Sequence, residues 1–384
     1  MSRIDDLIER YAPEGVEYRA LGDLVRIKNG KDHKALADGE VPVFGSGGVM
    51  RYADTYAYDK PSVLIPRKGS LGNLFYVDVP FWTVDTIFYT EITESLILPK
   101  FLYHYLGTVG LGEMNQAGGV PSQTQGVLNK LRIPVPPLEV QQEIVRILDS
   151  FAELEAELEA ELETRRQQYD YYRDHLLSFP ADGAVHWRPM GEIATIVRGA
   201  SPRPIQRFLT DSGDGVPWIK IGDVAASGKY ITATAQRVTR EGAAKSRRIF
   251  PGDFVLSNSM SFGRPYISKI EGCIHDGWLA ISAFGDTFVP DFLFHLLRSA
   301  PIQAEFVRRA GDGGAVSNLN SDIVKSVLVP VPSLEEQSRI AEILDKFELM
   351  VNDLSSGLPA EIAARRQQYA YYRDRLLTFK EAVA

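Results

Sequence analysis

Apolar residues recur every three or four positions through two long segments of the chain, a spacing typical of amphipathic helices. In the first segment they stand at 144, 147, 151, 154, 158 and 162, and again at 169, 172, 176 and 179; the second segment repeats the series from 340 to 379. The first, 138–179, predicts a helix about 63 Å long. Such a helix cannot bury its stripe alone, so we expect the two helices to pair.

The rest of the chain has a different pattern. Short β-type runs such as SVLIP (62–66), LFYV (74–77) and DFVLS (253–257) are separated by turns rich in Gly, Asp, Asn and Pro. Helical stretches follow at 97–108 and 288–309. These patterns predict two mixed α/β domains, one before each long helix.

The whole arrangement is duplicated. RRQQYDYYRDHLLSF (165–179) and RRQQYAYYRDRLLTF (365–379) share 12 of 15 residues, and 133–151 matches 329–347 at 11 of 19 positions. The domains before these blocks match more faintly, with Asp85 aligned to Asp276 and His104 to His295. The repeating unit is therefore one domain followed by one long helix.

The two helices differ at their centres. The first carries AELE three times (152–163), and the second has Ser-Ser-Gly-Leu-Pro (355–359), where we expect a kink or a break. Segment 138–179 has 4 basic and 11 acidic residues, whereas 185–333 has 17 basic and 13 acidic residues. The chain's net charge of −8 thus resides on the helices, and the second domain is mildly basic.

The sequence contains no recognisable catalytic motif. The sequence lacks a P-loop, an H-E-x-x-H motif and the Gly-rich turn and Asn/Asp-Pro-Pro-aromatic element of a methyltransferase. One cysteine, Cys273, excludes a disulfide scaffold, and six scattered histidines show no metal-ligand spacing. His104 and His295 are interpreted as core residues, and Asp85 and Asp276 as turn residues. We predict a non-catalytic protein without a metal site.

The order of these motifs resembles the specificity subunits of type I restriction–modification systems. The resemblance rests on Pro134–Glu139 with Gln142 and Ile144, on Pro330–Glu336 with Gln337 and Ile340, and on the helix ends that contain Tyr169, Tyr172, Arg173, Asp174 and their copies. The edges VPVFGSGG (41–48), IPRKGSLGN (65–73), PFWTVDT (80–86) and VPWIKIGD (216–223) are similar too. The resemblance extends over nearly the whole chain.

The resemblance implies a mixed α+β fold with two target-recognition domains, separated by two long coiled-coil helices that we predict to be antiparallel. The expected segments are an N-terminal helical stub (1–15), recognition domain 1 (16–133), the first spacer helix region (134–180), recognition domain 2 (181–329) and the second spacer helix region (330–384).

The resemblance also implies the partners. Each domain would read one half of a split site in double-stranded DNA, and the helices would set the spacer and dock two methyltransferase subunits, through which restriction/translocase subunits join. S-adenosylmethionine, ATP and Mg would be bound by those partners and not by this chain. The absence of a signal peptide or a spanning apolar run predicts a cytoplasmic protein without membrane contact.

Candidate contacts follow from position. Basic and polar residues at Gly-rich strand ends are candidates for DNA binding, because Arg and Asn can pair with base edges and Lys with phosphate: Lys28, Lys31, Arg67, Lys68, Ser70, Arg198, Arg203, Asn258, Ser259 and Arg264. The helix ends supply candidates for partner docking: Arg165, Arg166, Tyr169, Arg173, Arg365, Arg366, Tyr369 and Arg373. For Tyr172 and Tyr372, packing between the helices is favoured.

Three alternatives remain open at this point. The chain could be a coiled-coil scaffold for other proteins without a DNA role, the recognition subunit of another phage-defence methyltransferase system, or a hydrolase that uses Asp85 and Asp276.

The AELE repeats give a first test. Deleting Ala156–Glu159 shortens the helix by about 6 Å, close to two base pairs at about 3.4 Å each. We expect the unread spacer of the methylated DNA motif to shorten while both half-sites stay the same, as measured by sequencing methylated bases. An unchanged spacer would contradict this expectation. Because the deletion also rotates the helix by about 40°, retained folding must be confirmed by circular dichroism.

Overall fold

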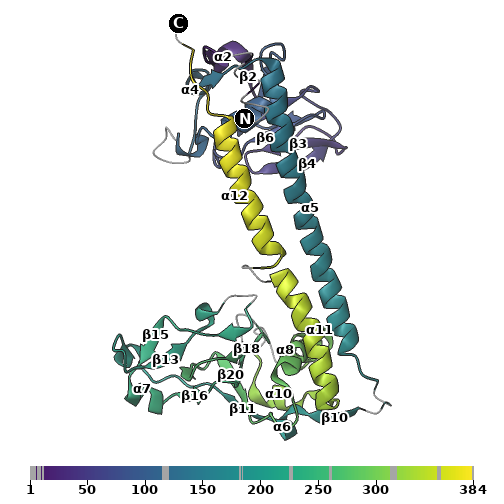
Figure 1. The fold of residues 1–384 in the computed structure, drawn as a ribbon, viewed down its shortest axis with the longest axis vertical. Coiled ribbons are helices and arrows are strands. Elements are labelled where there is room, and N and C mark those ends of the chain that lie inside the picture. The colour runs from purple at the N-terminus through teal and green to yellow at the C-terminus, as the bar shows by residue number, and fades with distance from the viewer. Residues whose placement is uncertain are drawn as a thin grey trace. The chain divides into compact units, whose positions relative to one another are not determined.

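The computed structural model describes residues 6, 10, 13–114, 121–180, 183, 185–224, 228–258, 262–311, 318–352 and 356–382. The chain forms two compact units: unit 1 comprises 1–157 and 362–384, and unit 2 comprises 158–361. Each unit contains one α/β domain, the start of the long helix that follows it and the end of the long helix of the other copy (Figure 1). The units therefore cut across the segments expected from sequence. Of the predicted stub at 1–15, the structure describes only residues 6, 10 and 13–15.

The long helices follow the apolar pattern. Helix α5 (Leu138–Leu176) is continuous and ends three residues before the predicted end. The second copy is two helices, α11 (Leu334–Asn352) and α12 (Leu358–Leu376), so the predicted break is confirmed. Pro359 in the first turn of α12 suits a helix start, because proline has no N–H to donate to the preceding turn.

The helices pair in antiparallel fashion, as predicted. In unit 1, the ring of Phe151 stacks on Tyr372 with centroids 5.5 Å apart, and Arg366 forms an ion pair with Glu155 at 2.6 Å. The partner numbers fall along α12 as they rise along α5, which defines the direction. In unit 2, Tyr172 of α5 stacks on Phe347 of α11 at 5.5 Å. The interpretation of Tyr172 and Tyr372 as inter-helix packing residues is confirmed, although both rings remain partly exposed.

The domain of unit 1 is built on small, mostly antiparallel sheets. The larger has the order β2-β8-β5-β6, the smaller β4-β3-β7, and β1 pairs with β9. Their bounds are β1 Tyr18–Ala20, β2 Val25–Asn29, β3 Val41–Gly45, β4 Gly48–Ala53, β5 Ser62–Pro66, β6 Phe75–Val77, β7 Trp82–Thr83, β8 Ile87–Ile92 and β9 Arg132–Pro134. The short helices are α2 Leu21–Leu24, α3 Pro99–Leu106 and α4 Gln125–Leu128. The predicted mixed α/β character is confirmed.

The domain of unit 2 repeats this plan with larger sheets. One has the order β11-β20-β17-β18-β14, another β12-β15-β13-β19-β16, and β10 pairs with β21. Their bounds are β10 His186–Pro189, β11 Thr195–Arg198, β12 Leu209–Thr210, β13 Val216–Ile219, β14 Tyr230–Ile231, β15 Gln236–Val238, β16 Arg247–Ile249, β17 Phe254–Ser257, β18 Pro265–Ser268, β19 Gly272–Ile274, β20 Trp278–Ser282 and β21 Leu328–Val331. The helices are α6 Met190–Ile193, α7 Arg240–Ala244, α8 Pro290–Arg298, α9 Ala300–Gly311 and α10 Ser321–Ser326.

One short helix in each domain packs against the long helices. In unit 2, Phe292 and Leu296 of α8 share an apolar cluster with Ile340 and Leu344 of α11 and with Tyr169 of α5. In unit 1, α3 occupies the same place between α5 and α12. Every large apolar side chain named here is at most 3 % exposed, so the long helices bury their stripes against the domains as well as against each other.

A buried glutamine fastens each long helix to its own domain. The Gln141 side chain accepts a hydrogen bond from the Leu98 backbone N–H at 2.8 Å and donates to the carbonyls of Leu96 and Pro136. Gln337 makes the equivalent bonds to Val289, Thr287 and Pro332. The residue equivalent to Gln337 is therefore Gln141. The assignment of Gln142 to the repeated motif was wrong.

The C-terminal segment completes unit 1. The Val16 N–H donates to the Lys380 carbonyl at 2.8 Å, and the Ala382 N–H donates to the Val16 carbonyl at 3.0 Å. Gly15 has φ +106°, and a Cβ there would lie 2.8 Å from the Lys380 oxygen, so the close approach requires glycine.

Replacing Gln141 or Gln337 with Ala is expected to lower the free energy of unfolding by about 2–4 kcal/mol, because each change strands a buried N–H and two carbonyls. Urea denaturation followed by circular dichroism measures the loss. The matched control is Gln167→Ala on the exposed face of α5, with an expected change within about 0.5 kcal/mol. Equal effects at all three positions would show that the buried amides have no special role.

Candidate nucleic-acid interface and helix contacts

The turn that contains Asp276 brings three of the candidate DNA-binding residues together. Arg198 and Asn258 donate to the Asp276 carbonyl at 3.0 and 2.8 Å, and the Arg203 guanidinium lies 3.6 Å from the carboxylate. Ser201 donates to the same carboxylate at 2.8 Å and, as the main cause, lowers the pKa of Asp276. The turn thus holds Arg198 through its backbone carbonyl and Arg203 through its carboxylate, at one end of β11 and β20.

The two arginines and Asn258 differ in accessibility. The Arg203 side chain is 84 % exposed and Arg198 is exposed, so both guanidinium groups are accessible to an anionic partner. Asn258 is only 5 % exposed and its amide already bonds to backbone. In the structure the Asn258 amide stabilises the turn, and a contact of Asn258 with DNA stays a prediction. Ser259 lies outside the described residues.

Unit 1 has the equivalent turn at Asp85. The Lys68 ammonium lies 3.8 Å from the Asp85 carboxylate, and Arg67 donates to the Asp85 carbonyl at 3.5 Å. Lys68 and Ser70 are exposed and Arg67 is partly exposed. Asp85 and Asp276 are thus turn residues that organise neighbouring basic groups, as interpreted from sequence, and each belongs to its own domain.

The other candidates in unit 1 are near this turn along the sheet. Lys31 is exposed, and its backbone N–H and carbonyl bond to the Thr83 carbonyl and the Trp82 indole. Lys28 is partly exposed and forms an ion pair with Glu91 at 3.3 Å. The Lys31 ammonium is consequently more accessible to DNA than that of Lys28.

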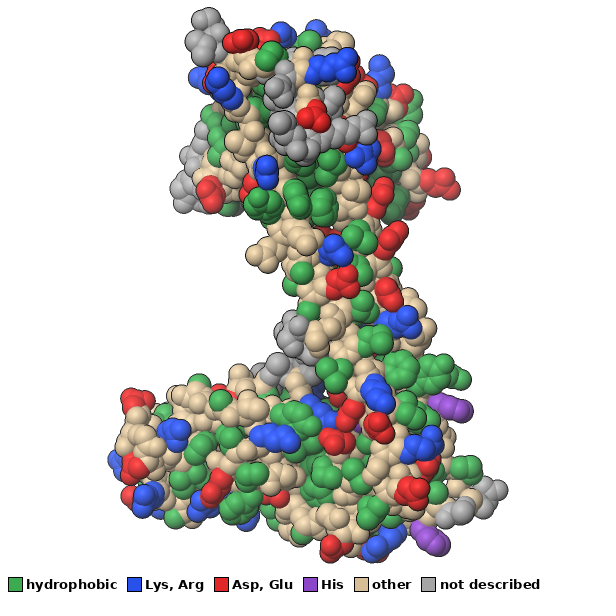
Figure 2. All heavy atoms as spheres, viewed as in Figure 1, with side chains coloured by type: hydrophobic (Ala, Val, Ile, Leu, Met, Phe, Trp, Pro, Cys, Tyr) green, Lys and Arg blue, Asp and Glu red, His purple; other side chains and the backbone are tan. Residues whose placement is uncertain are grey.

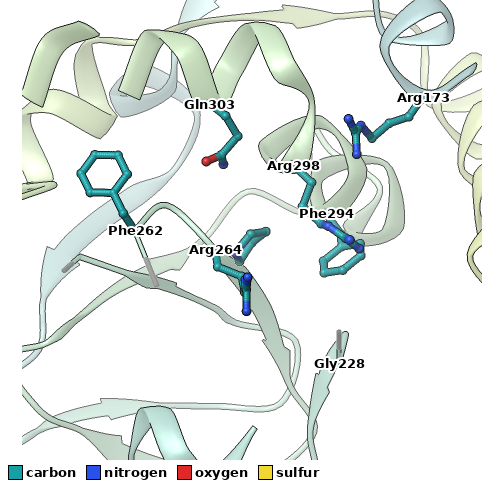
Figure 3. A pocket seen from close by; sticks show the side chains of 8 residues that line it. Arg173, Gly228, Phe262, Arg264, Phe294, Arg298 and Gln303 are labelled. Atoms are coloured by element: carbon teal, nitrogen blue, oxygen red, sulfur yellow. The ribbon is translucent and has the colours of Figure 1, made fainter. Parts of the chain in front are cut away.

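Arg264 lines a pocket in unit 2 together with two further arginines, Arg173 and Arg298, and the rings of Phe262 and Phe294 (Figure 3). Arg298 is paired with Glu348, and Arg173 with Asp170 and Asp174. Arg264 is partly exposed, and among the described residues no carboxylate is recorded beside it. Its guanidinium group is therefore accessible to an external anionic partner.

The predicted docking residues divide into buried and exposed groups. Tyr169 is 3 % exposed and Arg173 is 8 % exposed, so the structure places these two docking candidates in the interior of unit 2. Tyr369 is partly buried beside His104. Arg166 and Arg366 are exposed, whereas Arg165, Arg365 and Arg373 are partly exposed. The burial arises because the domain, and not only the partner helix, covers this face.

The two most exposed tyrosines of the same motif were not among the predicted docking residues. Tyr171 and Tyr371 are 65 % and 59 % exposed. A residue two positions along a helix is displaced by about 200°, so a tyrosine two positions after the buried Tyr169 must face away from the domain. The helical period thus contained the signal for these two residues.

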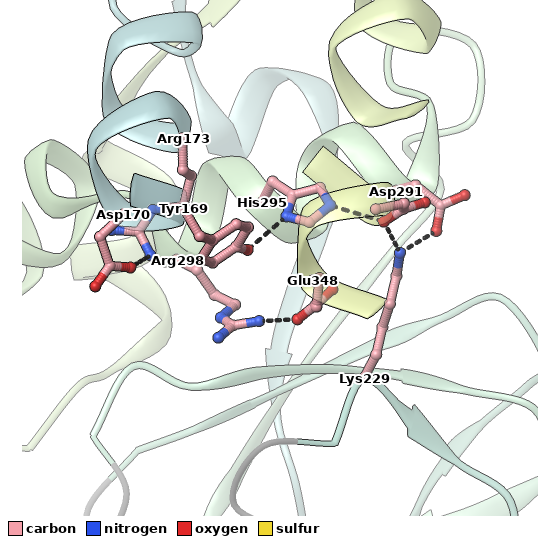
Figure 4. Close-up of polar contacts among 9 residues, drawn as sticks. Tyr169, Asp170, Arg173, Lys229, Asp291, His295, Arg298 and Glu348 are labelled. Carbon is pink, nitrogen blue, oxygen red and sulfur yellow. Dashed lines mark hydrogen bonds and ion pairs between the residues drawn. The ribbon is translucent and has the colours of Figure 1, made fainter. Parts of the chain in front are cut away.

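A histidine links each domain to both long helices. In unit 2, the two ring nitrogens of His295 bond to the Tyr169 hydroxyl and to Asp345, and Lys229 pairs with Asp345 and Asp291 (Figure 4). His104 and His295 are 5 % and 0 % exposed, so their interpretation as core residues is confirmed. Burial is the main cause that lowers the pKa of His104 and raises that of Tyr169.

The same cluster contains three side chains that could bind a metal ion. Ligand atoms of His295, Asp345 and Glu348 lie within 4.8 Å of one another. Lys229 already neutralises Asp345 at 2.6 Å, and Arg298 is paired with Glu348. A divalent cation would have to displace both side-chain cations, so the donor set fits ion pairs better than a metal.

Charged side chains of both signs are interspersed over the face drawn in Figure 2. None of the described helices is long and apolar enough to cross a membrane. Two copies of one domain, each with an accessible basic turn and fastened to long helices, are the arrangement expected of a protein that recognises two sites.

Comparison with known proteins gives the family. The family model of the type I restriction modification DNA specificity domain matches residues 13–164 and 185–364. The chain is 34 % identical over 305 residues to the type I restriction enzyme EcoR124I/EcoR124II specificity subunit of Escherichia coli. The aligned region covers 76 % of this chain and 73 % of that protein. The chain therefore belongs to the type I restriction–modification specificity subunits, the non-catalytic components that recognise the DNA target.

Solved structures share the fold. The S subunit of the M. genitalium type I restriction–modification system matches with a TM-score of 0.58 and 16 % identity, covering 94 % of this chain and 96 % of that one. A chain from a structural study of complex assembly and conformational transition of the type I R-M system matches with a TM-score of 0.62 and 18 % identity, covering 94 % and 97 %.

Burial of His104 predicts acid sensitivity in unit 1. Its pKa in the folded state lies below the ordinary 6.5, although Asp149 opposes the shift. Below pH about 6.5 the unfolded chain takes up a proton that the folded chain refuses, so stability is lost as the pH falls and is constant above it. We expect the melting temperature of wild type to fall between pH 7 and 5.5 more steeply than that of His104→Gln.

Differential scanning calorimetry across this range measures the two slopes. His186→Gln, at an exposed histidine, is the control and should retain the wild-type slope. Parallel slopes for wild type and His104→Gln would contradict the prediction.

Proposed function

We propose that the two domains read the two halves of a split DNA site. The proposal is supported by the duplicated turns at Asp85 and Asp276, each of which presents basic side chains at a strand end. The contacting residues are those of the candidate set that remain accessible: Lys31, Arg67, Lys68, Ser70, Arg198, Arg203 and Arg264. The domains differ in sequence around the common turn, which lets them recognise different bases.

The exposed part of the repeated motif is proposed to dock two methyltransferase subunits. The duplicated segments share 12 of 15 residues, and burial against the domain accounts for the identity of Tyr169 and Tyr369 but not for that of Tyr171 and Tyr371. Two copies of one partner would require the same surface twice, which gives the exposed identities a reason. Arg166 and Arg366 complete this surface.

The chemistry is assigned to the partners. The methyltransferase subunits would bind S-adenosylmethionine and methylate adenine in each half-site, and restriction subunits would use ATP and Mg for translocation and cleavage. This chain would act in the cytoplasm, where it would recognise the DNA target and set the spacing between its two half-sites. The scaffold alternative lacks a role for the paired basic turns, and the hydrolase alternative is disfavoured because both carboxylates, Asp85 and Asp276, already have basic partners.

The decisive experiment is a methylome. The gene is expressed with its neighbouring genes in a host without adenine methylation, and modified bases are located by sequencing. The expected result is a new split motif that disappears when this gene alone is removed. A soluble complex with the methyltransferase that produces no motif would overturn the proposal.

Arginine substitutions then assign the half-sites. We expect Arg203→Ala and Arg198→Ala to weaken DNA binding by the complex about tenfold to a hundredfold and to relax base preference in one half-site only, because a bidentate arginine–base contact contributes about 1–3 kcal/mol. Arg308→Ala, on the exposed surface of α9, is the control. Fluorescence anisotropy with single-base variants of the motif measures both quantities. A uniform loss over all sequences would assign these arginines to phosphate instead.

A further inference from the structure

One polar bridge in unit 2 joins three separate elements. The Nδ1 atom of His295 on α8 lies 3.0 Å from the Tyr169 hydroxyl on α5, and its Nε2 atom lies 2.7 Å from Asp345 on α11 (Figure 4). His295 and Tyr169 are almost completely buried. A single imidazole of the domain therefore contacts both long helices at once.

Unit 1 contains the same bridge. His104 on α3 lies 3.3 Å from the Tyr369 hydroxyl on α12 through Nδ1 and 3.2 Å from Asp149 on α5 through Nε2. Because burial keeps His104 neutral, Nε2–H donates to the carboxylate and Nδ1 accepts from the phenol. In both units the aspartate belongs to the domain's own long helix and the tyrosine to the long helix of the other copy.

The ion pair beside each bridge is made by lysines that are not equivalent. Lys100 pairs with Asp149 at 2.6 Å, whereas in the second copy the aligned position is Asp291, and Lys229, from another segment, pairs with Asp345 at 2.6 Å. The same charge compensation therefore arises from two positions. This makes the contact itself, and not only shared ancestry, the common feature of the two halves.

A polar bridge of this kind selects one helix register. Apolar stripes with a spacing of three and four can pair in more than one register, and a buried polar residue among them removes this freedom. Sliding either helix by one turn, about 5.4 Å, would leave one nitrogen of the buried histidine without its partner. The rigid imidazole, bonded on two sides, thus fixes where its domain sits along both helices.

We propose that the Tyr169–His295–Asp345 and Tyr369–His104–Asp149 bridges determine how many base pairs the protein accepts between the two half-sites. The inference rests on the proposed function, because it presupposes a split site. One helical turn of about 5.4 Å corresponds to between one and two base pairs at about 3.4 Å each. The bridge residues are positioning residues: they touch no DNA, and they hold each recognition domain in one register on the helices.

The test uses the complex of this chain with its methyltransferase subunit and a set of DNA duplexes. All duplexes carry the same two half-sites, and the spacer varies by single base pairs around the wild-type length. The variant Tyr169→Phe/Tyr369→Phe removes both hydroxyls but keeps the rings. We expect its methylation rate on spacers changed by one or two base pairs, relative to the wild-type spacer, to rise about tenfold, as for the loss of one net hydrogen bond in each unit.

The matched control is Tyr171→Phe/Tyr371→Phe, which removes the exposed hydroxyls of the same motif and should retain the wild-type spacer profile. A bridge that only stabilises the fold would lower the rates on all spacers by one common factor. A folded bridge variant with the wild-type profile therefore overturns the inference. If the double variant does not fold, Tyr369→Phe alone is used, and an unchanged profile there overturns the inference equally. Absence of a split site in wild type would instead refute the proposed function.

Discussion

The burial of one short helix between two long helical segments is the constraint on which each half of the molecule depends. In both units this helix carries the apolar residues that fill the space between the segments and the histidine that bonds to both. Neither segment could bury its stripe without the domain, because each would otherwise expose several large side chains to water. Recognition domain and helices are thus a single folding unit in each half.

This constraint separates the surfaces of each domain by task. The side that faces the long helices is occupied by ion pairs and by the buried amides of Gln141 and Gln337, and it resembles a protein core. The turns at Asp85 and Asp276 remain accessible and carry exposed basic groups. A domain can therefore change its base contacts without disturbing the packing that positions it.

Much of the fold could be predicted from the sequence, because duplication and helical period are one-dimensional signals. The two α/β domains, the pairing of the long helices and the break before Pro359 follow from them. The orientation of Tyr169 did not, since the stripe does not reveal that a domain covers it. The burial of Asn258 and the pairing of Lys229 with Asp345 depend on contacts between distant segments, which spacing alone cannot indicate.

The closure of unit 1 by its last segment has a consequence for biosynthesis. Unit 2 is one continuous stretch, residues 158–361, and all of its contacts are available once that stretch has left the ribosome. Unit 1 begins earlier but lacks the partner of Val16 and the tyrosine for His104 until residues 362–384 are made. Its apolar surface therefore stays incompletely covered while the whole second half is synthesised. The unit whose synthesis starts first is completed last.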